Sequence, residues 1–323
     1  MSAALDALAG LYEEVADFPK SLEATQRRVQ IVEQLNDPLE RADLHRMLAI
    51  GYEHLGDFRE GLTHSEQSYR LASTSAPYLY HNVSIVDAVR SCWKWNRWDE
   101  AERWCRLADQ ITAQPVRPGL RRTTAAFRAF AAGVRGDVEE TRRRQGEFEA
   151  VSGGDPALAW VAALLRWFIA WALDDRVNAR TFADDALRLA NTPQAKLEVR
   201  SNVLQFAAEA GEWQYVDTLS DETLESARRS GGRHYVALTC RALGIHRREH
   251  GRYDQAAALL TEAVDLFRAL DCPWDLGKAL RDLAILRRAH GRADEAIPLL
   301  QEALTNFENL RALPDIERTR ALM

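Results

Sequence analysis

The sequence predicts an all-α protein, a right-handed solenoid of about eight helix-turn-helix units. Three observations support this prediction. Short turn signatures recur about every 40 residues, prolines recur with the same period, and the stretches between them have helical periodicity. No useful length of alternating apolar and polar residues is present, so strands are not expected. About sixteen helices are predicted.

The turn signature is a small or polar residue, then a polar residue, often followed by an aromatic one. Its first members are spaced by 40, 40, 40, 38, 37, 40 and 40 positions. These members are Ala16, Gly56, Asn96, Gly136, Asp174, Gly211, Gly251 and Gly291. The spacing predicts a tight turn inside each helical hairpin.

Prolines lie midway between these turns, at positions 38, 77, 115, 156, 193, 273 and 314, and Gly231-Gly232 takes the remaining slot. Proline suits the first position of a helix, because the N–H that it lacks has no partner there. Asp37 and Asp155 precede their prolines as candidate N-caps. The predicted units are 1–37, 38–76, 77–114, 115–155, 156–192, 193–232, 233–272 and 273–313, with a partial helix at 314–323.

Each predicted hairpin has one apolar face that it cannot bury alone, so the units are expected to stack. In residues 251–270, for example, apolar positions step by three and four: Ala256, Leu259, Leu260, Ala263, Val264, Phe267 and Leu270. Small residues such as Gly61 allow the two helices of a hairpin to approach closely. The stack is expected to leave a concave groove lined by the first helix of each unit.

The units resemble tetratricopeptide repeats. Gly56, Phe58 and Gly61 match that pattern, as do Gly251, Tyr253, Ala256 and Ala263, and Asn96, Trp98, Ala101 and Ala108 fit with Asn in place of Gly. The usual repeat has 34 residues, whereas these have about 40. Long repeats of this kind resemble the sensor regions of bacterial LuxR-type ATP-dependent regulators and related signalling ATPases and cyclases. The resemblance implies a regulatory module rather than a catalytic one.

The repeat register places charged and aromatic side chains along the predicted groove. Residues 1–80 have a net charge of −6 and residues 226–292 of +6, and seven of the nine tryptophans lie between positions 93 and 171. The candidate binding residues are Arg90, Trp93, Phe130, Phe168, Trp171, Arg241, Arg248, Lys278, Arg281 and Arg288. The basic residues would hold an acidic group and the aromatic ones an apolar group. The alternative is that the tryptophans form the core and the arginines a solvated face.

Catalytic and metal motifs are weak. His246 to His250 reads HRREH, which matches an inverted zinc-protease pattern, but His250 precedes a repeat turn just as His290 does. No phosphate-binding glycine loop, nucleophile elbow or reactive cysteine context is found. We therefore expect no enzyme activity, no cofactor and no metal.

The composition favours a cytoplasmic location. The net charge is −6, so neither nucleic acid nor a membrane surface is expected as a partner. Residues 157–173 are apolar but short, with Arg166 in the middle, which favours a buried helix over a membrane span. Four cysteines without a CxxC pair do not form a disulfide framework.

The predicted function is a non-catalytic module that binds a protein or peptide, as a regulatory or scaffolding part of bacterial signalling. The alternative is a small-molecule effector-sensing domain of a transcriptional or signalling regulator. Neither end has a clear long cap, so self-association is a further expectation.

Overall fold

The computed structural model describes residues 1–35, 37–75, 79–111, 118–153 and 158–323, and these contain 17 helices and no strand. The helices are α1 (Ser2–Glu14), α2 (Phe18–Leu35), α3 (Pro38–Leu55), α4 (Phe58–Ser75), α5 (Leu79–Lys94), α6 (Trp98–Gln110), α7 (Pro118–Val134), α8 (Val138–Val151), α9 (Ala159–Ala172), α10 (Arg176–Leu189), α11 (Pro193–Ala210), α12 (Trp213–Ser230), α13 (Arg233–Glu249), α14 (Tyr253–Ala269), α15 (Pro273–Ala289), α16 (Ala293–Leu310) and α17 (Leu313–Arg320). The all-α prediction is confirmed.

The eight predicted turns adopt one conformation. The first residue of every turn signature has a positive φ, including 86° at Gly56 and 58° at Asn96. Glycine adopts this left-handed conformation without steric cost, and asparagine is enriched there among the other residues. The turn signature thus marks where each hairpin reverses direction.

Helix starts follow the predicted proline pattern wherever the chain is described. Pro38, Pro193 and Pro273 are the first residues of α3, α11 and α15. Asp37 caps α3, since its Oδ1 accepts a hydrogen bond from the Leu39 N–H at 2.8 Å. The prolines at 77, 115 and 156 and the candidate cap at 155 lie outside the described residues.

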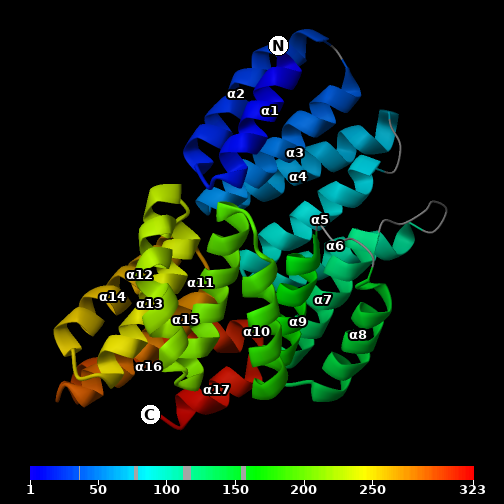
Figure 1. Cartoon of the computed structure of the whole chain (residues 1–323). Helices are drawn as coiled ribbons and strands as arrows, with labels where there is room; N and C mark the ends of the chain where they lie inside the picture. The colour runs from blue at the N-terminus through cyan, green and yellow to red at the C-terminus, as the bar shows by residue number, and fades with distance from the viewer. Residues whose placement is uncertain (36, 76–78, 112–117, 154–157) are drawn as a thin grey trace.

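The helices pack as antiparallel hairpins, each stacked on the next to form a solenoid (Figure 1). Close approach within a hairpin uses small residues, as predicted. A Cβ added at Gly61 in α4 would lie 3.2 Å from the carbonyl oxygen of Ala49 in α3. Ala101, Ala256 and Ala303 are likewise fully buried.

The solenoid does not extend as an open rod, because its later units curve back onto the earlier ones (Figure 1). Several of the residue pairs that hydrogen-bond there are separated by 174 to 181 positions in the sequence. We call this contact the closure seam. Its two sides are residues 18–19, 54–57, 94–98 and 136, and residues 231–235, 270–275 and 313–314.

Three contacts of the closure seam join an early turn to the start of a later helix. Arg233 Nε donates to the Leu55 carbonyl oxygen at 3.0 Å. Asn96 Oδ1 accepts from the Trp274 N–H at 3.0 Å. Pro314 lies beside Gly136. The 40-residue period recurs on both sides, so the contacts repeat in register as the halves come together.

Among the described residues, no helix is long and apolar enough to cross a membrane. The apolar segment noted in the sequence forms α9, which has 14 residues and packs with Trp167 and Ile169 buried.

Candidate binding cavity

A cavity of about 700 Å³ lies on the inner side of the solenoid. Most of its lining residues belong to α1, α3, α5, α7, α9, α11 and α13, which are the first helices of consecutive hairpins. This is the groove that the repeat pattern predicts. The lining residues come from the first six units and from His234 of the seventh, so the cavity lies between early and middle units.

One wall of the cavity is apolar and is formed mainly by α9. Trp160, Leu164 and Phe168 follow at intervals of four residues, so they share one face of the helix. Trp93 of α5 lies 5.0 Å from Phe168, measured between ring centroids. This wall can hold an apolar group.

The facing wall carries charges from α1, α3, α5 and α11. Arg46 Nε lies 3.2 Å from Asp87 Oδ2, and Lys94 Nζ lies 3.2 Å from Glu198 Oε1. Glu13 Oε1 lies 3.4 Å from His54 Nε2. Basic and acidic side chains therefore alternate along the wall.

Glu53 is buried behind this wall and anchors it. Arg90 Nη2 donates to Glu53 Oε1 at 3.0 Å, and Lys94 Nζ lies 2.9 Å from the same oxygen. Burial alone would raise the pKa of Glu53, but Arg90 and Lys94 outweigh it and lower that pKa to about 2. Glu53 stays ionised and fixes both cations at the edge of the cavity.

Three of the predicted binding residues, Arg90, Trp93 and Phe168, line the cavity together. Two others do not: Phe130 is buried, and Trp171 is half-buried. Both belong to an aromatic cluster that also contains Trp98 and Trp274. The alternative interpretation of the tryptophans as core therefore holds for this cluster.

The predicted late cations have partners within the chain. Arg241 is fully buried, and its Nε donates to Asp282 Oδ2 at 2.7 Å. Glu209 Oε1 lies 2.7 Å from Arg241 Nη1 and 2.6 Å from Lys278 Nζ. The Lys278 ammonium also lies over the Trp171 and Trp274 rings.

The remaining cations also lie away from the cavity. Arg281 Nη1 donates to Asp315 Oδ1 at 2.7 Å, Arg248 pairs with Glu249, and Arg288 is exposed. This arrangement differs from the expected open basic groove. The sequence period places these residues on inner helices, but stacking of the late hairpins pairs most of them with acidic residues of the inner helices α11 and α15 and of α17.

Several cavity residues are absent from the predicted set. Lys94 and Asp87 lie on the helix face that carries Arg90, at spacings of four and three residues, so the helical period could have identified them. Glu198 comes from α11, three hairpins away from α5. Only the stacking geometry brings it to Lys94.

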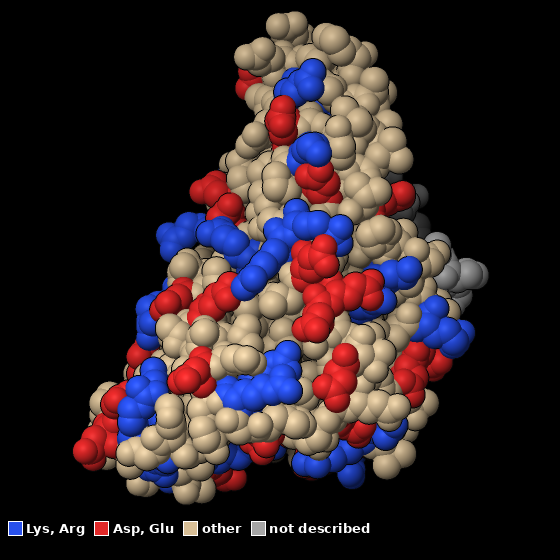
Figure 2. Space-filling view, turned by 60° about the vertical axis from the view of Figure 1, so that its left-hand side comes forward, with Lys and Arg blue, Asp and Glu red and all other residues tan. Residues whose placement is uncertain are grey.

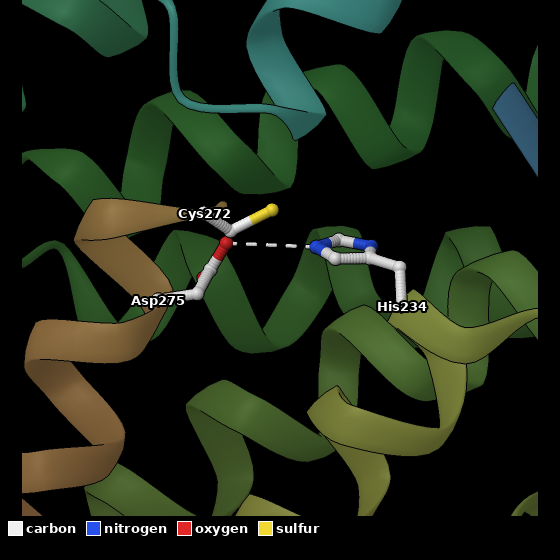
Figure 3. A group of neighbouring side chains, drawn as sticks. All are labelled: His234, Cys272 and Asp275. Carbon is white, nitrogen blue, oxygen red and sulfur yellow. Dashed lines mark hydrogen bonds and ion pairs between the residues drawn. The ribbon is translucent and has the colours of Figure 1, made fainter. Parts of the chain in front are cut away.

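His234, Cys272 and Asp275 form a buried group whose donor atoms all lie within 4.8 Å of one another (Figure 3). Such a donor set matches the ligands of zinc. Each side chain, however, already has a partner at the closure seam. Asp275 Oδ2 accepts from Asn96 Nδ2 at 3.2 Å and lies 3.5 Å from His234 Nε2, and Cys272 Sγ donates to the Lys94 carbonyl oxygen.

Burial also raises the pKa of Cys272 well above its usual value, so the sulfur is a neutral thiol. Zinc binds the thiolate, and forming it here would break the bond to Lys94. The group is therefore better explained as part of the closure seam than as a metal centre.

The HRREH segment ends α13. His246 Nε2 lies 3.0 Å from Asp217 Oδ1, and His250 Nδ1 hydrogen-bonds with the His246 carbonyl oxygen. The second imidazole is thus engaged by its own helix. We therefore interpret His246 and His250 as part of the C-terminal end of α13 and not as zinc ligands.

The outer surface has mixed charge. On the face shown in Figure 2, basic and acidic side chains are interspersed over the whole length of the molecule. Exposed ion pairs such as Arg228–Glu262 and Arg268–Glu302 join neighbouring hairpins. This face therefore carries no extended basic surface of the kind that binds nucleic acid.

No known protein-family profile matches the chain. A stretch of 70 residues is 37% identical to Tonsoku-like protein of Mus musculus, and it spans 21% of this chain and 5% of that protein.

Two solved structures are similar over most of the chain. A Rap protein complexed with Competence and Sporulation Factor has a TM-score of 0.66 at 12% identity, covering 92% of this chain and 81% of that one. The signal transduction ATPase PH0952 of Pyrococcus horikoshii, which has a tetratricopeptide repeat sensor, has a TM-score of 0.53 at 12% identity. That match covers 93% of this chain and 52% of that one. The chain therefore has the fold of tetratricopeptide-repeat proteins.

Proposed function

We propose that the chain is a non-catalytic module that binds a short peptide, or an extended segment of a protein, in its inner cavity. The observation that supports this proposal is the amphipathic lining of the cavity, with an apolar wall on α9 facing a charged wall on α3, α5 and α11. We further propose that it serves as a regulatory or scaffolding part of bacterial signalling.

The cavity suits a peptide in both size and chemistry. Its volume of about 700 Å³ lies within the range of about 300–1,000 Å³ that is usual for ligand sites. Trp160, Leu164 and Phe168 offer contacts for apolar side chains. Asn202 and Gln194 contribute carboxamides, which have both a donor and an acceptor and can therefore pair with peptide groups.

The similar structures support this role by analogy of fold. The Rap protein was solved with Competence and Sporulation Factor bound, and the repeat region of PH0952 is a sensor in a signalling ATPase. Catalysis is not proposed, because the acidic residues of the cavity are paired with basic ones, as in Asp87–Arg46 and Glu198–Lys94.

A small-molecule effector is the second candidate. The volume of the cavity favours it, since drug-sized ligands occupy sites of the same size. A thermal-shift screen with metabolites separates the two candidates, because a bound ligand raises the melting temperature in proportion to the logarithm of its concentration over its dissociation constant.

Gly119 offers a direct test. It lines the cavity in the first turn of α7, and a Cβ placed there would meet nothing within 4 Å. Gly119→Trp should therefore fill the cavity and leave the fold intact. Gly146→Trp is the matched control, since Gly146 is an exposed helical glycine of α8 with equally open space.

Immobilised protein would be challenged with a mixture of N-acetylated hexapeptides of random sequence, and the retained peptides would be quantified by mass spectrometry. The wild type and Gly146→Trp should retain a distinct subset that Gly119→Trp loses. Equal retention by all three proteins, or no retention by the wild type, would contradict the proposal.

A further inference from the structure

We infer that the ligand of the cavity carries an acidic group, a carboxylate or a phosphate, bound between Arg46 and Arg90, and an apolar portion that packs against α9. This inference rests on the proposed function and specifies the chemistry of the ligand. It moves the acid-binding role from the late arginines to two residues of α3 and α5.

The charges that the cavity wall leaves accessible are mainly positive. The side chains of Arg46 and Arg90 are 30% and 32% exposed, although both line the cavity. The acidic side chains of the same wall are covered more fully, with Asp87 at 4% and Glu198 at 10%. Glu13, at 26%, is engaged by His54. Arg46 and Arg90 are therefore the most exposed of these charged side chains, and a ligand in the cavity can contact them.

Arg46 and Arg90 lie in the same corner of the cavity. Arg46 Nε is 3.2 Å from Asp87 Oδ2, and Arg90 follows Asp87 by three residues on α5, close to one helical turn. Burial raises the pKa of Asp87, and both guanidinium groups oppose that rise. Arg46 is paired with Asp87 and Arg90 with Glu53, so a ligand would be bound by the N–H donors that these two pairs do not use.

The guanidinium groups retain capacity for a ligand. Each has five N–H donors, and a carboxylate or phosphate can accept two of them side by side. Within the described part of the chain, Arg90 donates one hydrogen bond, from Nη2 to Glu53 Oε1 at 3.0 Å. Glu53 holds the side chain in place from behind, so Arg90 is positioned before a ligand arrives.

Two of the predicted cations of the late units have no such capacity for a ligand. Arg241 is buried, and its guanidinium bonds Asp282, Glu209 and Gln205. Lys278 is sandwiched between Glu209 and two indole rings. These two cations are satisfied by the chain itself, whereas Arg46 and Arg90 face the cavity.

The apolar requirement comes from α9. Its side chains Trp160, Leu164 and Phe168 line the same cavity as Arg46 and Arg90. A ligand that fills the volume must therefore combine an acidic group with an apolar portion. A purely ionic ligand such as free phosphate would leave the aromatic wall uncovered.

Three pools of N-acetylated, C-terminally amidated hexapeptides test this inference. Each pool is random except at one fixed position, which is Glu in the first pool, Gln in the second and phosphoserine in the third. The immobilised wild type should retain the Glu pool or the phosphoserine pool about tenfold more than the Gln pool. Whichever of the two acidic pools is retained more identifies the acidic group as a carboxylate or as a phosphate.

Arg46→Gln and Arg90→Gln should each reduce this preference to near unity, and Arg46→Lys should restore part of it because the charge is kept. Arg288→Gln is the control, since Arg288 is exposed outside the cavity. Far-ultraviolet circular dichroism verifies the fold of each variant, and if Arg90→Gln unfolds, the two Arg46 variants complete the test.

The outcomes distinguish the two proposals. If the wild type retains all three pools equally and Gly119→Trp abolishes retention, the acidic group is refuted and the binding cavity stands. A preference that survives Arg46→Gln also refutes the inference. If the wild type retains no pool, the proposed function itself fails.

Discussion

Asn96 caps the helix α15, which begins at Pro273 on the other side of the closure seam. Its side-chain Oδ1 accepts hydrogen bonds from the backbone N–H groups of Trp274 and Asp275, at 3.0 and 3.2 Å. Its Nδ2 donates to Asp275 Oδ2. The first N–H groups of a helix have no partner within it, and an Asn usually supplies one from the adjacent position in the chain. Here the cap comes from across the closure seam.

Asn96→Gly should destabilise the fold by about 2 kcal/mol, because it removes the cap and leaves buried donors unpaired. Glycine tolerates the φ of 58° at this position, so the loss reports the hydrogen bonds rather than backbone strain. Chemical denaturation monitored by circular dichroism measures it. Asn96→Asp keeps the acceptor but places a second carboxylate against Asp275 Oδ2, so it should lose at least as much at pH 7. A loss below about 0.5 kcal/mol for Asn96→Gly would argue against a capping role.

Gly56→Ala should be more harmful than Gly251→Ala. Both glycines have a positive φ, 86° and 70°, so both substitutions introduce the same kind of strain. An added Cβ at Gly56 would also lie 2.7 Å from Leu270 Cδ2 across the closure seam, whereas nothing lies within 4 Å at Gly251. We expect an additional loss of about 1–2 kcal/mol for Gly56→Ala in thermal or urea unfolding. Equal losses would mean that the seam is not closely packed in solution.

Glu209→Gln should cost about 3 kcal/mol at pH 7, because it leaves Lys278 buried without its carboxylate. Glu225→Gln, at an exposed position, is the control and should change stability by less than about 0.5 kcal/mol. Adding Lys278→Met to Glu209→Gln should recover part of the loss, since an apolar side chain needs no counter-ion. A double variant that is no more stable than Glu209→Gln would contradict this account.

The effect of Glu209→Gln should also depend on pH. Burial alone would raise the pKa of Glu209, but Lys278 and Arg241 outweigh it and lower that pKa to about 2. A depressed carboxyl pKa contributes stability that is complete above the unfolded value of 4.5 and is lost as the pH falls towards 2. The difference between wild type and variant should therefore shrink between pH 4.5 and pH 2, and a constant difference would exclude the ionised pair as its source.

The pair of His45 and His64 should make the second hairpin sensitive to mild acid. Their Nδ1 atoms are 2.8 Å apart, so one ring must be neutral to accept the hydrogen bond. Burial, together with His64, lowers the pKa of His45 to about 4. Between pH 6.5 and pH 4 the unfolded chain binds more protons than the folded one, so stability falls as the pH falls.

The loss should be on the order of 1–2 kcal/mol after allowance for solvent screening. His45→Gln should flatten the stability profile in this interval, as measured by urea unfolding at a series of pH values. Profiles of equal slope for wild type and variant would assign the acid sensitivity to other groups.

The sequence predicts the repeat well, because each turn and each apolar face is a local property. The positive φ of Gly56 and Asn96 follows directly from residue types at the 40-residue spacing. The closure seam could not be predicted in this way. It joins Arg233 to Leu55 and Asn96 to Trp274, and their proximity depends on how far every preceding hairpin rotates.

The same dependence on long-range geometry explains where the predicted and the observed site residues differ. Arg90, Trp93 and Phe168 line the cavity. Their helices α5 and α9 are only two hairpins apart, so the repeat period is enough to place them on one inner surface. Arg241 and Lys278 occupy inner helices too, but they are paired with acidic residues of other inner helices, and this pairing depends on how the late hairpins stack. Their acidic partners, Asp282 and Glu209, are equally visible in the sequence and carry no signal of being paired.

In a linear array of repeats, a terminal hairpin has one neighbour and can detach without disturbing the rest. The closure seam gives the first hairpins a second neighbour and converts the row into a ring. Amide protons in α1–α4 should consequently exchange as slowly as those of the middle units, and melting should proceed as a single concerted transition instead of peeling inwards from one terminus.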